Sequence, residues 1–81
     1  MKFYYVYILV SQVDPERHYT GYTEDVKQRL DEHNAGKLPN TKRYRPWRVS
    51  SAHAFCDKSR ALAFELYLKS GSGREFARRH F

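Results

Sequence analysis

The sequence is short of cysteine and of long hydrophobic stretches, and both shortages exclude classes of protein. Its one cysteine, Cys56, cannot form an internal disulfide or a metal cage of several thiolates. The longest apolar run, residues 3–10, has eight residues, against roughly 18 for a membrane-spanning helix. This run also lacks the flanking residues of a secretory signal. We therefore expect a reduced, cytoplasmic protein with no membrane contact.

A chain of 81 residues is too short for two hydrophobic cores. A chain of this size buries only about 60–65% of the surface that its unfolded form exposes, so we predict a single domain over residues 1–81. Aromatic residues make up 16% of the sequence, which is too many for a disordered basic tail. The composition therefore predicts a small folded domain.

Positive charge is concentrated in the second half of the chain. Residues 1–36 contain four basic and six acidic residues, whereas residues 37–81 contain eleven basic and three acidic ones. Two groups hold most of the excess: the basic loop (Lys37, Lys42, Arg43, Arg45 and Arg48) and the C-terminal cluster (Lys69, Arg74, Arg78 and Arg79). Tyr44 and Trp47 lie among the basic-loop residues, a mixture that suits phosphate contacts and base stacking. We predict that the basic loop, with Lys69 and Arg74, binds nucleic acid; a solvated loop with Trp47 in the core is the alternative.

Aromatic and β-branched residues predict an antiparallel hairpin at the start of the chain. Residues 4–10 have the composition of a central strand, and Asp-Pro at 14–15 favours a turn before a second strand at 18–22. Each predicted strand carries a candidate functional tyrosine, Tyr7 on the first and Tyr19 on the second.

A helix is expected after the hairpin. Thr23 is its predicted N-cap, it ends near Asn34, and Gly36 can adopt the left-handed cap. The inward positions are Val26, Leu30 and His33. Residues 35–46 contain two prolines and a glycine, which predicts a long loop.

The remaining residues predict a third strand and further helices. The strand covers residues 47–56, and Asp57 or Ser59 caps the helix that follows. The predicted inward positions of this helix are Ala61, Leu62, Glu65, Leu66 and Lys69. Gly71 and Gly73 end it, and a short basic helix could close the chain. The order β-β-α-β-α predicts an α+β fold, a small three-stranded antiparallel sheet flanked by helices.

Glu65 is hard to explain as a purely structural residue. It falls inside the predicted apolar stripe, where a carboxylate is costly unless it is paired or bound to a cation. An ion pair with Arg29, or a position at the core boundary, would explain it without any function. The sequence leaves these alternatives open beside a metal-binding role.

Four further side chains have chemistry that complements a metal-bound glutamate. Arg29 and His33 are four residues apart and share one helix face. A surface ion pair of the arginine, a packed histidine and strand tyrosines that only pack are the structural alternatives. Together with Tyr7 and Tyr19, however, these residues suit metal-assisted phosphodiester hydrolysis. Arginine binds phosphate through a two-pronged fork, glutamate ligates a hard cation, and tyrosine or histidine moves a proton or orients water.

The order of four sequence elements over about residues 3–70 is distinctive. The elements are Tyr5-Val6-Tyr7, Tyr19-Thr20-Gly21, Arg29-Leu30-Asp31-Glu32-His33, and Asp57-Lys58-Ser59-Arg60-Ala61 followed by Glu65. This pattern resembles the GIY-YIG nuclease superfamily, above all its small stand-alone bacterial members and the N-terminal catalytic domain of the repair nuclease UvrC. The sequence departs from the family pattern at Tyr5 (glycine in the family) and Thr20 (isoleucine), and no asparagine follows Glu65.

The resemblance implies roles for the candidate residues. It implies one Mg²⁺ or Mn²⁺ ion on Glu65, Arg29 on the scissile phosphate, and Tyr7 and Tyr19 in water activation or phosphate positioning. His33 would then handle a proton or orient a partner. Because an unperturbed tyrosine has a pKa of about 10, a tyrosine acting as base needs a nearby cation. The sequence does not decide among Tyr7, Tyr19 and His33 as the base.

These observations predict a divalent-metal-dependent endonuclease domain. We expect it to hydrolyse phosphodiester bonds of DNA in a structure-dependent way, in a DNA-repair role, with a protein partner supplying targeting. The alternative is a catalytically weak or inactive nucleic-acid-binding module that acts with a partner protein. A structural or interaction protein with neither activity is the third hypothesis.

Overall fold

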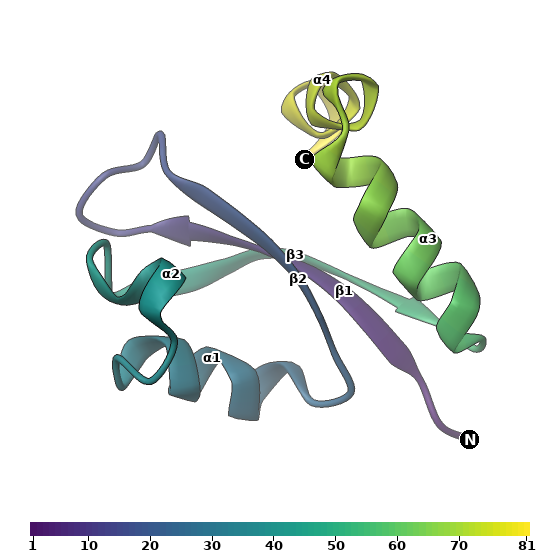
Figure 1. Cartoon of the computed structure of the whole chain (residues 1–81), viewed down its shortest axis with the longest axis horizontal. Helices are drawn as coiled ribbons and strands as arrows, with labels where there is room; N and C mark the ends of the chain where they lie inside the picture. Colours follow the sequence, from purple (N-terminus) through teal and green to yellow (C-terminus); the bar gives the residue numbers. More distant parts are fainter.

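Three strands form one antiparallel sheet in the order β2-β1-β3 (Figure 1). The computed structural model describes residues 1–81 and places β1 at Tyr4–Ser11, β2 at His18–Thr23 and β3 at Trp47–Phe55. Residues 6–11 of β1 are buried, as expected of a central strand that is covered on both faces. The sheet confirms the predicted α+β fold, and it leaves β2 and β3 as the two edges.

Helices cover both faces of this sheet (Figure 1). The helices are α1 (Val26–Asn34), α2 (Pro39–Lys42), α3 (Lys58–Lys69) and α4 (Gly71–His80). In Figure 1, α1 and α2 lie on one side of the strands and α3 and α4 on the other. No helix has both the length and the apolar character needed to cross a membrane.

Alternating side chains of β1 supply two small cores, one for each helical layer. Tyr7 and Leu9 pack with Trp47 on the face toward α1, whereas Val6 and Ile8 pack on the opposite face. The core on that opposite face also contains Ala61 and Leu68 of α3. The side chain of Tyr7 therefore has to be buried for the α1 layer to form.

The segment from β2 to β3 differs in two places from the sequence prediction. Asp25, and not Thr23, caps α1, because the Asp25 carboxylate accepts from Gln28 N at 3.0 Å. Gly36 does adopt the left-handed conformation, with φ of 77°. The predicted loop over residues 35–46 contains the short helix α2, which begins with Pro39 at a position that needs no N–H donor.

The predicted N-cap of α3 is confirmed at Asp57, but three of its predicted inward positions are wrong. Leu62 and Leu66 are 41% and 73% exposed and Lys69 is exposed as well, whereas Ala61 and Leu68 are buried. A 3.6-residue period allows either stripe, and Phe64 selects the observed one by packing on Phe55 at 5.4 Å between ring centroids. This rotation puts Glu65 at the border of the core.

Gly21 allows the Tyr7 side chain to approach the edge strand. The two residues are paired across β1 and β2, and an ideal Cβ on Gly21 would lie 2.5 Å from the Tyr7 hydroxyl oxygen. Only a residue without a side chain therefore fits opposite Tyr7.

We predict that Gly21→Ala lowers the free energy of unfolding by about 1–3 kcal/mol, since the added methyl group overpacks a filled site. Urea-induced unfolding monitored by circular dichroism measures the effect. Gly71→Ala is the matched control, because nothing lies within 4 Å of its ideal Cβ and it begins a helix. Equal effects of the two substitutions would contradict this account of Gly21.

Candidate active site

A buried chain of polar side chains connects the sheet, α1 and α2. The Tyr7 hydroxyl oxygen lies 2.9 Å from Nε2 of His33, and Nδ1 of His33 lies 2.6 Å from Oγ1 of Thr41. Tyr7, His33 and Thr41 are 2%, 0% and 1% exposed. The Thr41 hydroxyl donates to the Leu38 carbonyl at 3.4 Å. One assignment satisfies every donor: Tyr7 donates to Nε2, and Nδ1–H donates to Thr41.

Tyr19 completes an aromatic cluster around His33. Its ring centroid lies 5.0 Å from that of His33 and 6.3 Å from that of Tyr7, with tilted or edge-on geometry. Unlike Tyr7 and His33, Tyr19 is only partly buried, and its hydroxyl has no hydrogen-bond partner in the protein. Tyr19 is therefore the member of this cluster whose hydroxyl can reach a water molecule.

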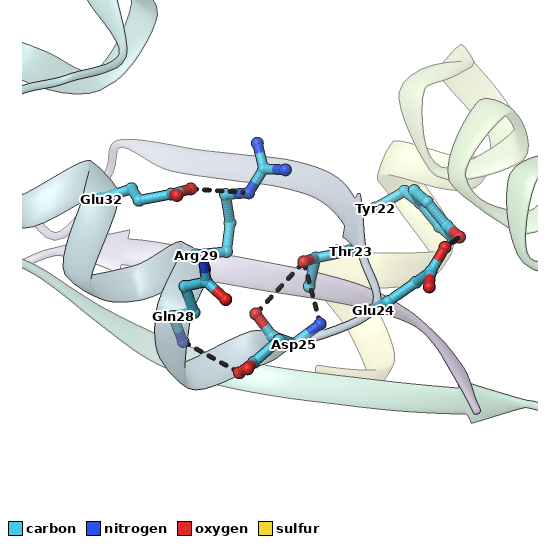
Figure 2. A pocket seen from close by; sticks show the side chains of 7 residues that line it. All are labelled: Tyr22, Thr23, Glu24, Asp25, Gln28, Arg29 and Glu32. Atoms are coloured by element: carbon cyan, nitrogen blue, oxygen red, sulfur yellow. Dashed lines mark hydrogen bonds and ion pairs between the residues drawn. The ribbon is translucent and has the colours of Figure 1, made fainter. Parts of the chain in front are cut away.

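Arg29 lies one helical turn before His33 on α1 and lines a surface cavity of about 260 Å³. Its Nε lies 3.2 Å from a carboxylate oxygen of Glu32, and Figure 2 shows its two terminal nitrogens bonded to none of the residues drawn. The surface ion pair that the sequence allowed for the arginine is therefore present, with Glu32 as its partner, and Arg29 forms no pair with Glu65. The free side of the guanidinium remains available for an anion.

Glu65 approaches this cluster from α3, in the layer on the other side of the sheet (Figure 1). Its side chain is 20% exposed, and its carboxylate lies 3.1 Å from Nζ of Lys69. This confirms a position at the core boundary and identifies the ion-pair partner as Lys69. The negative charge of Glu65 contributes to the raised pKa of Tyr7.

Burial and neighbouring charges set the protonation of Tyr7 and His33. Burial, followed by the neighbouring Tyr19, raises the pKa of Tyr7, whereas Arg29 opposes the rise and Glu65 adds to it. Burial, followed by the charge of Arg29, lowers the pKa of His33. At neutral pH the Tyr7 phenol is therefore protonated and the His33 imidazole is neutral.

The oxygen donors at the site fit a hard divalent ion only in part. No group of three or more histidine, cysteine, aspartate or glutamate side chains is gathered anywhere in the chain. Glu65 is therefore not part of a cluster of metal-ligating side chains. Mg²⁺ commonly binds through one or two carboxylates and otherwise through water and substrate phosphate. The residues present suit that mode of binding, with Glu65 as the protein ligand.

The two basic groups lie on different layers of the protein. The basic loop accompanies α2, whereas Lys69 and Arg74 lie on α3 and α4 across the sheet (Figure 1). None of the five basic-loop side chains forms an ion pair, so their charges are not neutralised within the protein. The predicted nucleic-acid-binding residues are thus exposed, but they form two surfaces.

The aromatic residues among the basic-loop side chains differ in their roles. Trp47 is 4% exposed and its Nε1 donates to the Thr41 carbonyl at 2.8 Å. Trp47 is therefore part of the core, one of the two roles that the sequence left open for it, and it cannot stack on a base. Tyr44 is partly exposed, with the guanidinium of Arg17 4.6 Å and that of Arg43 5.4 Å from its ring centroid. Tyr44 remains the stacking candidate.

Sequence reasoning missed Thr41 and Asn34, which hold the site together. Thr41 fixes the His33 ring, and Asn34 brackets the Trp47 backbone, accepting from its N at 2.6 Å and donating to its O at 3.0 Å. Both contacts join segments that are distant in sequence, so no local pattern could have indicated them. An Asn at a helix end is a common cap, and Thr41 lay in a predicted loop.

Comparison with known proteins identifies the family. Residues 3–79 match the GIY-YIG catalytic domain. This chain belongs to the GIY-YIG family. The match confirms the resemblance seen in the sequence, and it spans the three-stranded sheet and the helices that cover it.

Individual GIY-YIG relatives differ in length. The chain is 44% identical over 68 residues to the structure-specific endonuclease subunit slx1 of Schizosaccharomyces japonicus, covering 78% of this chain but only 25% of slx1. It is 41% identical over 67 residues to a UPF0213 protein of Haloquadratum walsbyi, covering 82% and 75% of the two chains. The NMR structure of a UPF0213 protein from Bacillus halodurans is similar, with a TM-score of 0.56, 35% identity and coverage of 94% and 80%.

Thr41→Val tests whether the threonine hydroxyl holds His33. We expect it to lower the free energy of unfolding by about 1–3 kcal/mol, because a buried ring nitrogen loses its hydrogen-bond partner. Thr41→Ser keeps the hydroxyl and serves as the control, with a smaller loss measured by urea-induced unfolding. If the serine variant were as unstable as the valine variant, packing of the methyl group would explain Thr41 instead.

The lowered pKa of His33 predicts a specific pH dependence of stability. As the pH falls below about 6.5, the unfolded chain takes up the proton first, so the folded protein loses stability. We expect an NMR titration midpoint for the His33 ring below 6.5 and a smaller acid-induced loss of stability in His33→Gln. Burial also lowers the pKa of His53. His53→Asn therefore measures the part of the acid-induced loss of stability that belongs to His53 and not to His33. A His33 midpoint at or above 6.5 would contradict the prediction.

Proposed function

We propose that this GIY-YIG domain is a divalent-metal-dependent endonuclease that hydrolyses phosphodiester bonds of DNA, in a structure-dependent way. One observation carries the proposal: Tyr7, His33 and Tyr19 form one cluster, and Arg29 lies one helical turn from His33 on α1. Ordered hydroxyl groups beside an arginine, together with a carboxylate such as Glu65, are the groups that phosphodiester hydrolysis requires.

The relatives support the same activity. The fungal relative is named as a structure-specific endonuclease subunit, and the word subunit indicates that slx1 works in an assembly. The present chain spans about a quarter of slx1, so the preference for structured DNA, the protein partner and the repair role are parts of our proposal. We place the activity in the cytoplasm, where the exposed free thiol of Cys56 would stay reduced.

Arg29 is proposed to bind the scissile phosphate. Its Nε is held by Glu32, which orients the guanidinium and leaves its terminal nitrogens free for the anion. A fork of two N–H groups can bind two phosphate oxygens at once and offset charge that develops in the transition state. Glu32 therefore acts as a positioning residue for Arg29.

Glu65 is proposed to hold the Mg²⁺ or Mn²⁺ ion. When bound, such an ion polarises the phosphate and lowers the pKa of a bound water. In the protein alone, Lys69 neutralises the Glu65 carboxylate at 3.1 Å, so ligation of a cation requires Lys69 to move aside. Lys69 is exposed enough to do so and lies next to Arg74, where phosphate oxygens would attract both side chains.

Tyr19 is the residue we propose to orient the attacking water. The hydroxyl of Tyr7 and both ring nitrogens of His33 already have protein partners, and burial raises the pKa of the Tyr7 phenol. Tyr7 and His33 therefore act as a rigid support, against which the Tyr19 ring packs. Tyr19 alone of the three presents an unpartnered hydroxyl toward solvent.

The basic loop is proposed to bind the DNA backbone. Its five cations form no ion pairs, and Thr41 at their centre is bonded to His33, so this surface is fixed relative to the site. Such contacts carry no sequence information, and the resulting affinity falls steeply with salt.

The second candidate function is nucleic-acid binding without turnover. The Lys69–Glu65 ion pair favours it, because a neutralised carboxylate is a weaker ligand for a cation. Both candidates share the basic surfaces, so dependence on metal, and not binding, separates them.

Glu65→Gln provides the decisive test of metal-dependent cleavage. We expect the purified protein to cut labelled flap or branched DNA with Mg²⁺ or Mn²⁺ and not to cut it in EDTA. Glu65→Gln should lower the activity at least about 100-fold, because the variant lacks the carboxylate that is proposed to ligate the metal. Asp31→Asn is the matched control, because Asp31 pairs with the exposed Lys27 and lies outside the site.

Each alternative outcome of that assay has a definite meaning. Cutting that survives Glu65→Gln would point to a contaminating nuclease. The non-catalytic binding module would be supported by two results together. The protein would cut none of the single-stranded, duplex, flap and branched DNAs, and the unaltered protein and Glu65→Gln would bind DNA equally and with the same sensitivity to salt.

A further inference from the structure

A groove of about 610 Å³ lies between β2 and the corner where α3 meets α4, on the layer opposite α1. Its floor is apolar and comes from elements distant in sequence: Ile8 of β1, Leu68 of α3, Ala77 of α4 and Phe81. Ile8 and Leu68 are 5% and 3% exposed, so the floor continues the core. Phe81 is 45% exposed, and its ring is held against His53 at 4.5 Å between centroids.

The rim of this groove carries more positive than negative charge. Three cations line it, Lys69, Arg74 and Arg78, together with the carboxylate of Glu16, and the charges of the cations differ in availability. Lys69 is paired with Glu65 and Arg78 with Glu75, whereas Arg74 forms no ion pair. An apolar floor below a free guanidinium matches a ligand with a flat apolar part and an anionic part.

The groove adjoins the candidate active site. Tyr19 lines the groove and also packs on His33, with 5.0 Å between ring centroids. Lys69 lines the groove and also holds the Glu65 carboxylate at 3.1 Å. A ligand in the groove would therefore contact two residues, Tyr19 and Lys69, that also belong to the candidate active site or to its ion pair.

We propose that this groove holds an unpaired nucleotide of the DNA strand next to the scissile phosphate. The base packs on the apolar floor against Phe81, and the adjoining phosphate binds Arg74. A base in a continuous duplex has both faces stacked and cannot reach the floor, whereas an unpaired base can stack on an aromatic ring. A volume of about 610 Å³ is within the roughly 300–1,000 Å³ of small-ligand sites.

This inference deepens the proposed function, on which it rests for the position of the scissile phosphate. It gives a physical origin for a preference for structured DNA. Duplex binds through phosphate contacts with the basic loop, whereas the groove adds affinity only where a base is unpaired. The groove therefore discriminates between DNA forms without reading sequence.

Fluorescence anisotropy in EDTA measures this binding without any cleavage. The probes are a fluorescein-labelled DNA duplex, the same duplex with a short single-stranded flap, and the same flap with abasic sites. We expect the flap to bind at least about fivefold more tightly than the duplex, the usual scale of one stacked base. The abasic flap keeps its phosphates, including the one proposed to bind Arg74, but lacks the base, so its affinity should lie between those of the duplex and the intact flap.

Three variants locate the effect in the groove. Phe81→Ala should remove the flap preference and leave duplex affinity unchanged, and Arg74→Ala should weaken flap binding more than duplex binding. Arg60→Ala is the matched control, because Arg60 is an exposed cation of α3 outside the groove. It should weaken flap and duplex binding equally or not at all.

The proposal is overturned if flap and duplex bind equally, if the abasic flap binds as tightly as the intact flap, or if Phe81→Ala weakens both probes alike. The abasic comparison uses the unaltered protein, so it remains decisive should a variant fold poorly. A protein that prefers the flap but never cuts it would disprove the proposed nuclease function and leave the groove intact. A protein that cuts with metal but does not prefer the flap would disprove the groove proposal and leave the proposed nuclease function intact.

Discussion

The hydrogen bond between Tyr7 and His33 is the interaction on which the rest of the structure depends. Both side chains are almost fully buried, and each would leave an unsatisfied polar group in the core without the other. The bond ties the central strand to α1, and its continuation to Thr41 ties α1 to the basic loop. An 81-residue chain has little core to spare, so the same contacts stabilise the fold and arrange the candidate active site.

Charge is distributed so that the charged residues of the candidate active site are paired with opposite charges, whereas those of the surrounding surfaces are not. At the patch Arg29 is paired with Glu32 and Glu65 with Lys69, whereas the basic loop and Arg74 lack acidic partners. The net charge of +6 is thus presented mainly at positions where a phosphate backbone can lie. In the proposed function, substrate phosphate would compete with Glu65 for Lys69, which is the event that would free the Glu65 carboxylate.

The parts of the structure that the sequence predicted are those governed by local patterns. Strand alternation placed Tyr7 and Tyr19, and helix spacing placed Arg29 and His33 on one face. The positions of Thr41 and Trp47 depend on contacts between distant segments, which no local pattern encodes. The sheet-facing stripe of α3 was wrong at Leu62 and Leu66 for a related reason, since helical periodicity allows two stripes and only tertiary packing selects one.

The sheet itself restricts where a site with these residues can form. Arg29 and His33 come from one helical layer and Glu65 from the other, so they can meet only around an edge strand. At β2 the absence of a side chain on Gly21 leaves room for the Tyr7 hydroxyl, and α3 lies along the same strand. A DNA strand at this edge has the basic loop on one side and the Arg74 groove on the other. Duplex DNA is stiff over such short distances, so two binding surfaces on opposite faces of one sheet are consistent with the proposed preference for branched or flap DNA.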